Sequence, residues 1–209
     1  MQPNYKGTFE AHITIKTLNS DLKRKFSSLC HKLRVKSVFI ELPKGVNRSQ
    51  PMTASYHHGT FRDVLQKINQ IAQNIVDAGF EVTRIKIEAM VSNQDIPMYD
   101  IEAQKLPKSN YFEFHVKTIL SGSDNLEMLR QCCLQHDAHL SKNAFKKFIN
   151  EKQERFITMR MYGVGYKSAQ TGFDKLINCL KAKGFKLSQQ QREYAVYDSN
   201  LNLDAGWTD

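Results

Sequence analysis

The sequence predicts an α+β protein in which residues 1–104 and residues 105–209 form two tandem βαββαβ repeats with antiparallel sheets. Two strand patterns that both contain Glu-x-His lie 103 positions apart in the 209-residue chain. A Gly-Phe pair follows a helical pattern in each half, at positions 79–80 and 184–185. These matches predict an internal duplication that forms one compact, pseudo-symmetric unit.

The first strand of each repeat alternates between apolar and polar residues. In residues 8–15 and 111–120, every second side chain lies on the same face, as in a β-strand with one buried side. The polar faces carry Glu10, His12 and Thr14 in the first repeat and Glu113, His115 and Lys117 in the second.

The remaining elements of the first repeat follow from apolar spacing and from helix-capping residues. Asn19 and Thr60 begin helical patterns, and Gly79 ends the second helix. Strands are predicted at residues 35–42, 52–58 and 81–91, and residues 92–109 form a connector.

The second repeat shows the same order with one weak element. A cap at residues 122–124 begins its first helix, and Gly184 ends its second. Strands are predicted at residues 155–162 and 194–197. The missing strand should lie in residues 139–149, where the pattern is poor, and residues 198–209 form a tail that contains Trp207.

One βαββαβ unit has the ferredoxin-like plan, in which helices cover one face of the sheet and the other face stays open. Since apolar residues meet the helices, the polar residues face outward, and the two open faces could form a cleft or a barrel. The open faces are predicted to carry Glu10, His12, Thr14, Thr53, Ser55, His57, Arg84, Lys86, Glu88, Glu113, His115, Lys117, Thr158, Arg160, Tyr162, Arg192 and Tyr194.

This set of side chains favours chemistry on phosphate esters. His12 and His115 would act as general acid and base, and Glu10 and Glu113 would orient them or hold a metal. Positive and hydroxyl groups suit a phosphate and its transition-state charge. The predicted substrate-binding residues are Thr14, Lys117, Lys86, Arg160, Arg192, Tyr162 and His57.

A cofactor is either absent or a divalent metal ion. Glu10 and His12 share one face of a strand, and His57 on a neighbouring strand is the third candidate ligand. Gly163-Val164-Gly165 lacks the third glycine of a dinucleotide-binding loop, which disfavours a nucleotide-cofactor enzyme.

His12-Ile13-Thr14-Ile15 resembles the His-x-Thr-x motif of the two-histidine phosphoesterases. That resemblance implies two related lobes with one motif each, facing a central cleft that acts on RNA ends, cyclic phosphates or related phosphodiesters. It implies that His12 and His115 are the acid and base and that Thr14 binds phosphate. The second motif has Lys117 in place of the threonine.

Residues 113–117, Glu-Phe-His-Val-Lys, are similar to the Glu-x-Glu-x-Lys motif of the CYTH-class triphosphate tunnel enzymes, with His115 in place of the middle glutamate. That resemblance implies a barrel of repeated halves lined with Arg, Lys and Glu. In such a barrel, carboxylates hold a divalent metal and basic residues hold a polyphosphate, as in a triphosphatase.

The net charge of +9 favours a phosphate-bearing small molecule or an RNA end as partner, although a positive surface also serves solubility. No apolar run reaches the ~20 residues that span a bilayer, and the four cysteines form no Cys-x-x-Cys pair, so we expect a cytoplasmic protein without a membrane partner. The alternatives are a non-catalytic nucleotide-, phosphate- or RNA-binding protein and a partner-docking protein. The oligomeric state stays open.

Overall fold

The computed structural model describes residues 3–17, 19–121, 124–143 and 152–207. The first repeat contains β1 (Lys6–Ile15), α1 (Ser20–Lys32), β2 (Lys36–Glu41), β3 (Ser49–Thr60), α2 (Phe61–Asp77) and β4 (Val82–Met90). The connector contains α3 (Asp100–Ala103). The second repeat contains β5 (Tyr111–Ser121), α4 (Asp124–Gln135), β6 (Ala138–Asn143), β7 (Lys152–Tyr162), α5 (Tyr166–Ala182) and β8 (Leu187–Asp198), and the tail contains the 3-10 helix η1 (Leu201–Asp204).

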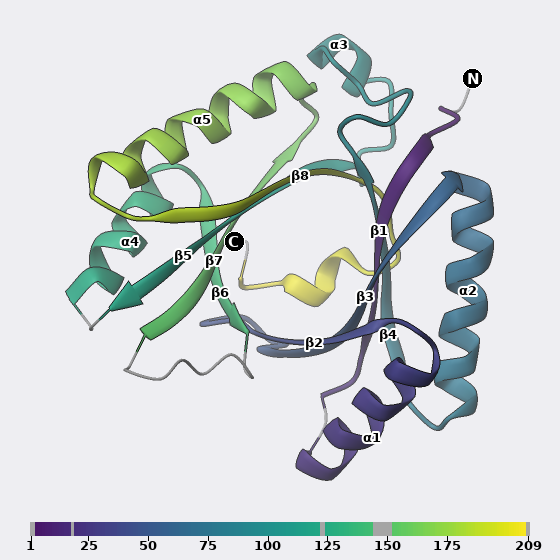
Figure 1. Ribbon diagram of the computed structural model, residues 1–209. Coiled ribbons are helices and arrows are strands. Elements are labelled where there is room, and N and C mark those ends of the chain that lie inside the picture. Colours follow the sequence, from purple (N-terminus) through teal and green to yellow (C-terminus); the bar gives the residue numbers. More distant parts are fainter. Residues whose placement is uncertain (1–2, 18, 122–123, 144–151, 208–209) are drawn as a thin grey trace.

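The strands close into one antiparallel barrel in the order β1-β3-β2-β6-β7-β5-β8-β4 (Figure 1). Within each repeat the order is that of the ferredoxin-like plan, with the first and third strands central. The two sheets join where β4 pairs with β8 and where β2 pairs with β6. The predicted α+β duplication is therefore confirmed, and the two open faces form a closed lumen rather than an open cleft.

The helices lie outside the ring of strands, with α1 and α2 on the first repeat and α4 and α5 on the second (Figure 1). Each helix buries its apolar face against the outer face of its sheet. For example, the Phe114 and Phe173 rings pack edge to face with their centroids 5.3 Å apart, and Phe26 packs on Phe80 at 5.4 Å. The apolar core thus lies between strands and helices, and the polar side chains of β1 and β5 point into the lumen.

The third strand faces the opposite way from the prediction. His57 pairs directly with Phe9 on β1, and residues that are opposite each other in an antiparallel pair share a face. Phe9 is fully buried under the helices, so His57 lies there too, with its Nε2 2.8 Å from Ser55 Oγ. The expectation that Thr53, Ser55 and His57 face the lumen is wrong. Met52, Ala54 and Tyr56 line it instead.

The last strand also presents the face opposite to the predicted one. Arg192 pairs with Phe114 on the helix side, where its Nε donates to Gln170 Oε1 at 2.7 Å. β8 is also longer than predicted and irregular at its start, where Gln189 has a φ of 46° and the pairing with β5 shifts between His115 and Lys117. The expectation that Arg192 and Tyr194 face the lumen is wrong.

The weak strand signal in the second repeat corresponds to β6, which ends at Asn143. The rest of that prediction, at residues 144–149, lies outside the described residues, as do residues 122 and 123 of the predicted helix cap. The predicted connector contains one short helix, α3, and its backbone at Tyr99 lies against the start of α5.

We expect Gly165→Ala to destabilise the fold through this contact. A Cβ at Gly165 would lie 2.4 Å from the carbonyl carbon of Tyr99, so the backbone of one segment would have to move. We expect a loss of about 1–3 kcal/mol in the free energy of unfolding, measured by urea denaturation.

Gly172→Ala is the matched control, because it adds the same methyl group within α5 at ordinary contact distance, 3.7 Å from Met161 Sδ. It should be neutral or stabilising, since alanine favours the helix over glycine. Equal stability of the two variants would contradict the proposed contact.

Candidate functional site

The lumen contains a cavity of about 700 Å³ whose wall is rich in charged side chains. Its lining includes residues of all eight strands and two residues of the C-terminal tail, Asp204 and Trp207. A cavity of this size is typical of small-molecule sites. Among the lining residues are Glu10, His12, Thr14, Arg84, Lys86, Glu113, His115, Lys117, Thr158, Arg160, Gln191 and Glu193.

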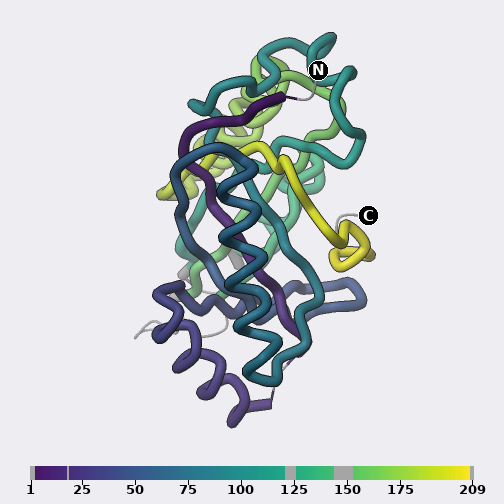
Figure 2. Tube along the Cα trace, turned by 90° about the vertical axis from the view of Figure 1, so that its right-hand side faces the viewer, coloured from purple at the N-terminus to yellow at the C-terminus, as the bar shows by residue number. Residues whose placement is uncertain are grey.

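The tail closes one end of the barrel. It appears within the ring of strands in Figure 1 and at one end of the barrel in the perpendicular view of Figure 2. Asp204 Oδ2 accepts from Arg84 Nη1 at 2.8 Å and lies 2.7 Å from Arg160 Nη2. Gln50 Nε2 donates to the other carboxylate oxygen at 2.8 Å. Trp207 Nε1 donates to the Leu140 carbonyl at 3.0 Å and thereby holds the tail against β6.

Glu113 connects the C-terminal tail, which acts as a plug at one end of the barrel, to the middle of the lumen. One of its carboxylate oxygens bonds Arg160, and the other accepts from Lys86 Nζ at 2.7 Å and lies 3.1 Å from His115 Nε2. Although burial raises the pKa of Glu113, Arg160 and Lys86 bring it well below its usual value. The carboxylate is therefore ionised, and both of its oxygens have partners.

Glu88 lies next along the network and is completely buried. Lys86 Nζ is 3.0 Å from its Oε1, and His12 Nε2 is 3.2 Å from its Oε2. Burial raises the pKa of Glu88, but Lys86 and His12 lower it to about 2. Burial lowers the pKa of His12, and the contact with Glu88 raises it overall above 6.5.

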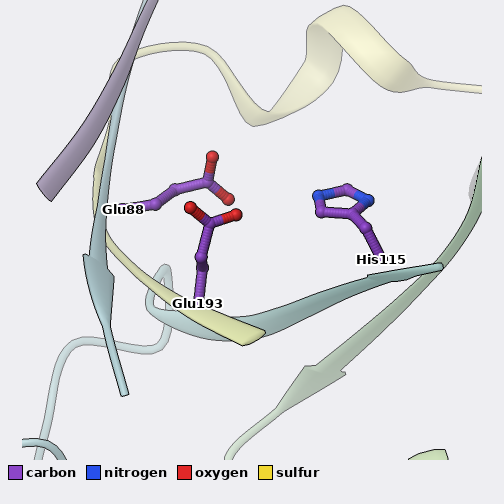
Figure 3. A group of neighbouring side chains, drawn as sticks. All are labelled: Glu88, His115 and Glu193. Atoms are coloured by element: carbon purple, nitrogen blue, oxygen red, sulfur yellow. The ribbon is translucent and has the colours of Figure 1, made fainter. Parts of the chain in front are cut away.

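Glu193 lies beside Glu88, and both approach His115. The two carboxylates lie side by side with the imidazole turned toward them (Figure 3). One ligand atom from each residue lies within 4.8 Å of the others. Burial and the neighbouring Glu88 and Glu10 raise the pKa of Glu193 well above its usual value. This trio lies on the adjacent strands β4, β5 and β8.

The predicted residues on the lumen wall are Glu10, His12, Thr14, Lys86, Glu113, His115, Lys117 and Arg160. Glu10 accepts from the Tyr56 hydroxyl at 2.8 Å, and Lys117 Nζ lies 4.7 Å from the centre of the Phe156 ring. Tyr162 is about half exposed, outside this cavity, and packs on Tyr111. His57 and Arg192 point away from the lumen, so the predicted metal set of Glu10, His12 and His57 is not assembled.

Several lumen residues were not predicted from the sequence, among them Glu193, Asp204 and Tyr56. Glu193 follows Glu88 at an offset of 105, which is the offset of the two Gly-Phe pairs, so the duplication itself contained this signal. Tyr56 has an apolar ring that suggested core. No pattern in the sequence connects Asp204 with Arg84, 120 positions away.

No protein-family model matches the chain, and no curated protein matches it. Among solved structures it is similar to protein BT0572 from Bacteroides thetaiotaomicron, at 11% identity over 97% of this chain and 99% of that one, with a TM-score of 0.34. It is also similar to the regulatory subunit of aspartate kinase from Thermus thermophilus in its ligand-free form, at 8% identity over 83% and 92% of the two chains, with a TM-score of 0.35. A mutant chlorite dismutase from Candidatus Nitrospira defluvii covers 91% and 92% at 9% identity, with a TM-score of 0.30.

Likenesses at these scores carry no argument about activity, and the resemblance to the two phosphate-processing families stays a prediction. Within the described residues, no helix combines the length and the apolar character needed to cross a bilayer.

We expect Asp204→Asn to destabilise the barrel in a pH-dependent way. Burial raises the pKa of Asp204, but Arg160 and Arg84 lower it overall below 3.8. A carboxyl group with a depressed folded-state pKa stabilises the fold above its unfolded pKa and loses that contribution as the pH falls through the folded-state value. Urea unfolding at pH 7 should show a loss of about 3–5 kcal/mol, because two buried guanidinium groups lose a partner.

The difference between wild type and Asp204→Asn should shrink as the pH is lowered below 3.8. Glu81→Gln is the control, since it removes an exposed ion pair with Lys16 and should change stability little at any pH. A pH-independent difference for Asp204→Asn would argue against the ionic role of this residue.

Proposed function

We propose that the protein is a phosphoester hydrolase that acts on a nucleotide or on the phosphate of an RNA end inside the barrel lumen. The observation that supports this most is the pairing of two imidazoles, His12 and His115, on one small cavity. They come from equivalent strands of the two repeats, and each contacts a buried carboxylate. Two positioned imidazoles supply both proton transfers of ester cleavage.

The contacts of His12 suit the role of general acid. Its Nδ1 lies 3.1 Å from the Thr53 carbonyl oxygen, which only accepts, so Nδ1 carries a hydrogen. Its Nε2 lies 3.2 Å from the carboxylate of Glu88, which is also an acceptor. With acceptors at both nitrogens, the ring is held in the protonated form and can give a proton to a leaving oxygen.

His115 has a different environment, which suits activation of the attacking water. Its Nε2 lies 3.1 Å from Glu113, and its Nδ1 lies 2.9 Å from the Thr158 hydroxyl, which can donate or accept. The Thr158 hydroxyl can therefore pair with Nδ1 whether or not that nitrogen carries a hydrogen. The two histidines thus differ in their partners as the acid and the base of one reaction should differ.

The substrate is expected to be small or to enter by its end. The cavity of about 700 Å³ has room for a nucleotide but not for a folded nucleic acid. Lys117 and Lys36 provide positive charge on its wall, and Thr14 provides a hydroxyl. Lys86 and Arg160 already bond Glu113, so we assign them to positioning the carboxylates as well as to neutralising phosphate charge.

We expect His12→Ala and His115→Ala each to lower kcat/KM by about 10²–10⁴-fold, because each removes one proton-transfer group. The assay is hydrolysis of cyclic nucleotides, of nucleoside triphosphates and of RNA oligonucleotides that end in a cyclic phosphate or a triphosphate. Binding of these substrates should change much less than turnover.

His31→Ala is the control, since His31 is an exposed residue of α1, and it should keep full activity. His57→Ala should also keep kcat, although its burial under the helices predicts a lower melting temperature. Wild-type turnover in both His12→Ala and His115→Ala would rule out the assigned roles.

A binding role without chemistry is the second candidate, and a neighbouring surface cavity favours it. This cavity shares Leu42, Ser141, Arg160 and Trp207 with the lumen. Its other lining residues include Lys44, Arg48, Arg130, Lys142 and Arg155. Such a basic groove beside the lumen suits a phosphate backbone, and salt-dependent RNA binding without turnover would favour this candidate.

A further inference from the structure

Two carboxylates and one imidazole converge beside the cavity, at a point where no described lysine or arginine contacts one of the carboxylates, that of Glu193. The trio is Glu88, His115 and Glu193, with ligand atoms within 4.8 Å of one another (Figure 3). Two of the three side chains are fully buried, and the imidazole of His115 faces the cavity. The trio therefore has a closed side toward the strands and an accessible side toward the lumen.

The Glu193 carboxylate has no described lysine or arginine beside it. Among the described residues, three buried cations, Arg84, Lys86 and Arg160, contact the carboxylates of Asp198, Asp204, Glu113 and Glu88. His12 contacts the carboxylates of Glu88 and Glu10 at 3.2 and 3.8 Å. In the same part of the chain, no lysine or arginine nitrogen lies within 4.0 Å of the Glu193 carboxylate, which accepts a hydrogen bond from Gln191. A buried carboxylate without a cation is costly, so a bound cation would stabilise this region.

Glu88 is neutralised, but its oxygens are open to a further ligand. It is 0% exposed, and Lys86 and His12 form ion pairs with its two carboxylate oxygens at 3.0 and 3.2 Å. Neither ion pair has the alignment of a hydrogen bond. A buried carboxylate normally has hydrogen-bonded partners or binds a metal.

We infer that Glu88, His115 and Glu193 bind one divalent transition-metal ion, such as Mn²⁺ or Zn²⁺, on the wall of the lumen. Oxygen and imidazole ligands together suit these ions. Ligand atoms around one ion are about 3–4 Å apart, so the trio needs to contract by only about 1 Å. Three protein ligands leave coordination positions open toward the cavity, as in catalytic metal sites.

The bound ion would add a metal to the proposed hydrolase site. Its catalytic role rests on the proposed function, whereas its binding does not. An ion held by His115 would activate a water opposite His12, because a bound divalent cation lowers the pKa of its water. It would also allow a phosphate to approach a wall that contains Glu10, Glu113 and Glu193, with Glu88 buried close to it. Without such a cation, these carboxylates would repel the substrate.

The test is Mn²⁺ binding to the full-length, metal-stripped protein without substrate, followed by EPR, in which the six-line signal of free Mn²⁺ disappears on binding. We expect one Mn²⁺ per chain in the wild type. Glu88→Gln and Glu193→Gln should each weaken the affinity by at least about tenfold. Pulsed EPR should detect a coordinated nitrogen in the wild type that is absent in His115→Gln.

Glu154→Gln is the matched control, because it removes another buried carboxyl group of the same cavity. Glu154 lies four residues along β7 from Thr158, the partner of His115, which places it about 13 Å from the trio. This variant should bind Mn²⁺ like the wild type. Circular dichroism of each metal-free variant checks the fold, and the nitrogen signal of the wild type tests the site even if a variant does not fold.

A wild type that binds no Mn²⁺, binds it without nitrogen coordination, or binds it as well after Glu88→Gln and Glu193→Gln would overturn the site. Because no substrate is present, the result is separate from the hydrolase proposal. Metal binding without hydrolysis of any phosphoester would support the metal site and reject the hydrolase proposal. Hydrolysis without metal binding would support the hydrolase proposal and reject the metal site.

Discussion

The matching of buried charges inside the barrel is the constraint on which the rest of the structure depends. A closed barrel of eight strands has an interior that side chains alone can nearly fill, and here many of those side chains are ionisable. Each buried charge has to meet an opposite charge, because transfer from water costs several kcal/mol per ion. Asp204, Arg160, Glu113, Lys86 and Glu88 meet this requirement as a continuous series of contacts from the plug to the middle of the lumen.

The duplication explains why the lumen has its composition, and the departures from symmetry explain its chemistry. Glu10, His12 and Glu88 have equivalents in Glu113, His115 and Glu193. Both halves therefore place the same acids and imidazoles at or beside one cavity, although Glu88 itself is fully buried. The neighbours of these groups differ, however. Glu113 bonds Arg160, whereas Glu10 accepts from the Tyr56 hydroxyl at the corresponding place. Lys86 likewise has Gln191 as its equivalent. The carboxylate of Glu113 is therefore neutralised by Arg160 and Lys86, whereas Glu10 has the uncharged partners Tyr56 and Gln191 at the corresponding places. A site with one basic and one acidic half can position an anionic substrate and a cation together.

The C-terminal tail makes the two ends of the lumen different. Through Asp204 and Trp207 it closes one end of the barrel and joins residues that are far apart in the chain. Arg84 and Arg160 lie in different repeats, and both bond the same carboxylate oxygen of Asp204. The tail is therefore part of the same ionic network as the site, and a change in the tail would reach His115 through Arg160 and Glu113.

Local pattern was sufficient for the strands, the helices, the duplication and the lumen face of β1 and β5, because alternation and helical spacing are properties of neighbouring residues. The spacing of Glu10, His12, Glu113 and His115 was enough to predict that they share one surface. The faces of β3 and β8 were decided by tertiary structure, since alternation defines two faces but not which of them a helix covers. Pairing of His57 with Phe9, and of Arg192 with Phe114, put both predicted binding residues under the helices. Closure of the barrel, the meeting of Glu88 with Glu193 and the docking of Asp204 on Arg84 depend on contacts between distant segments, and no short-range pattern records them.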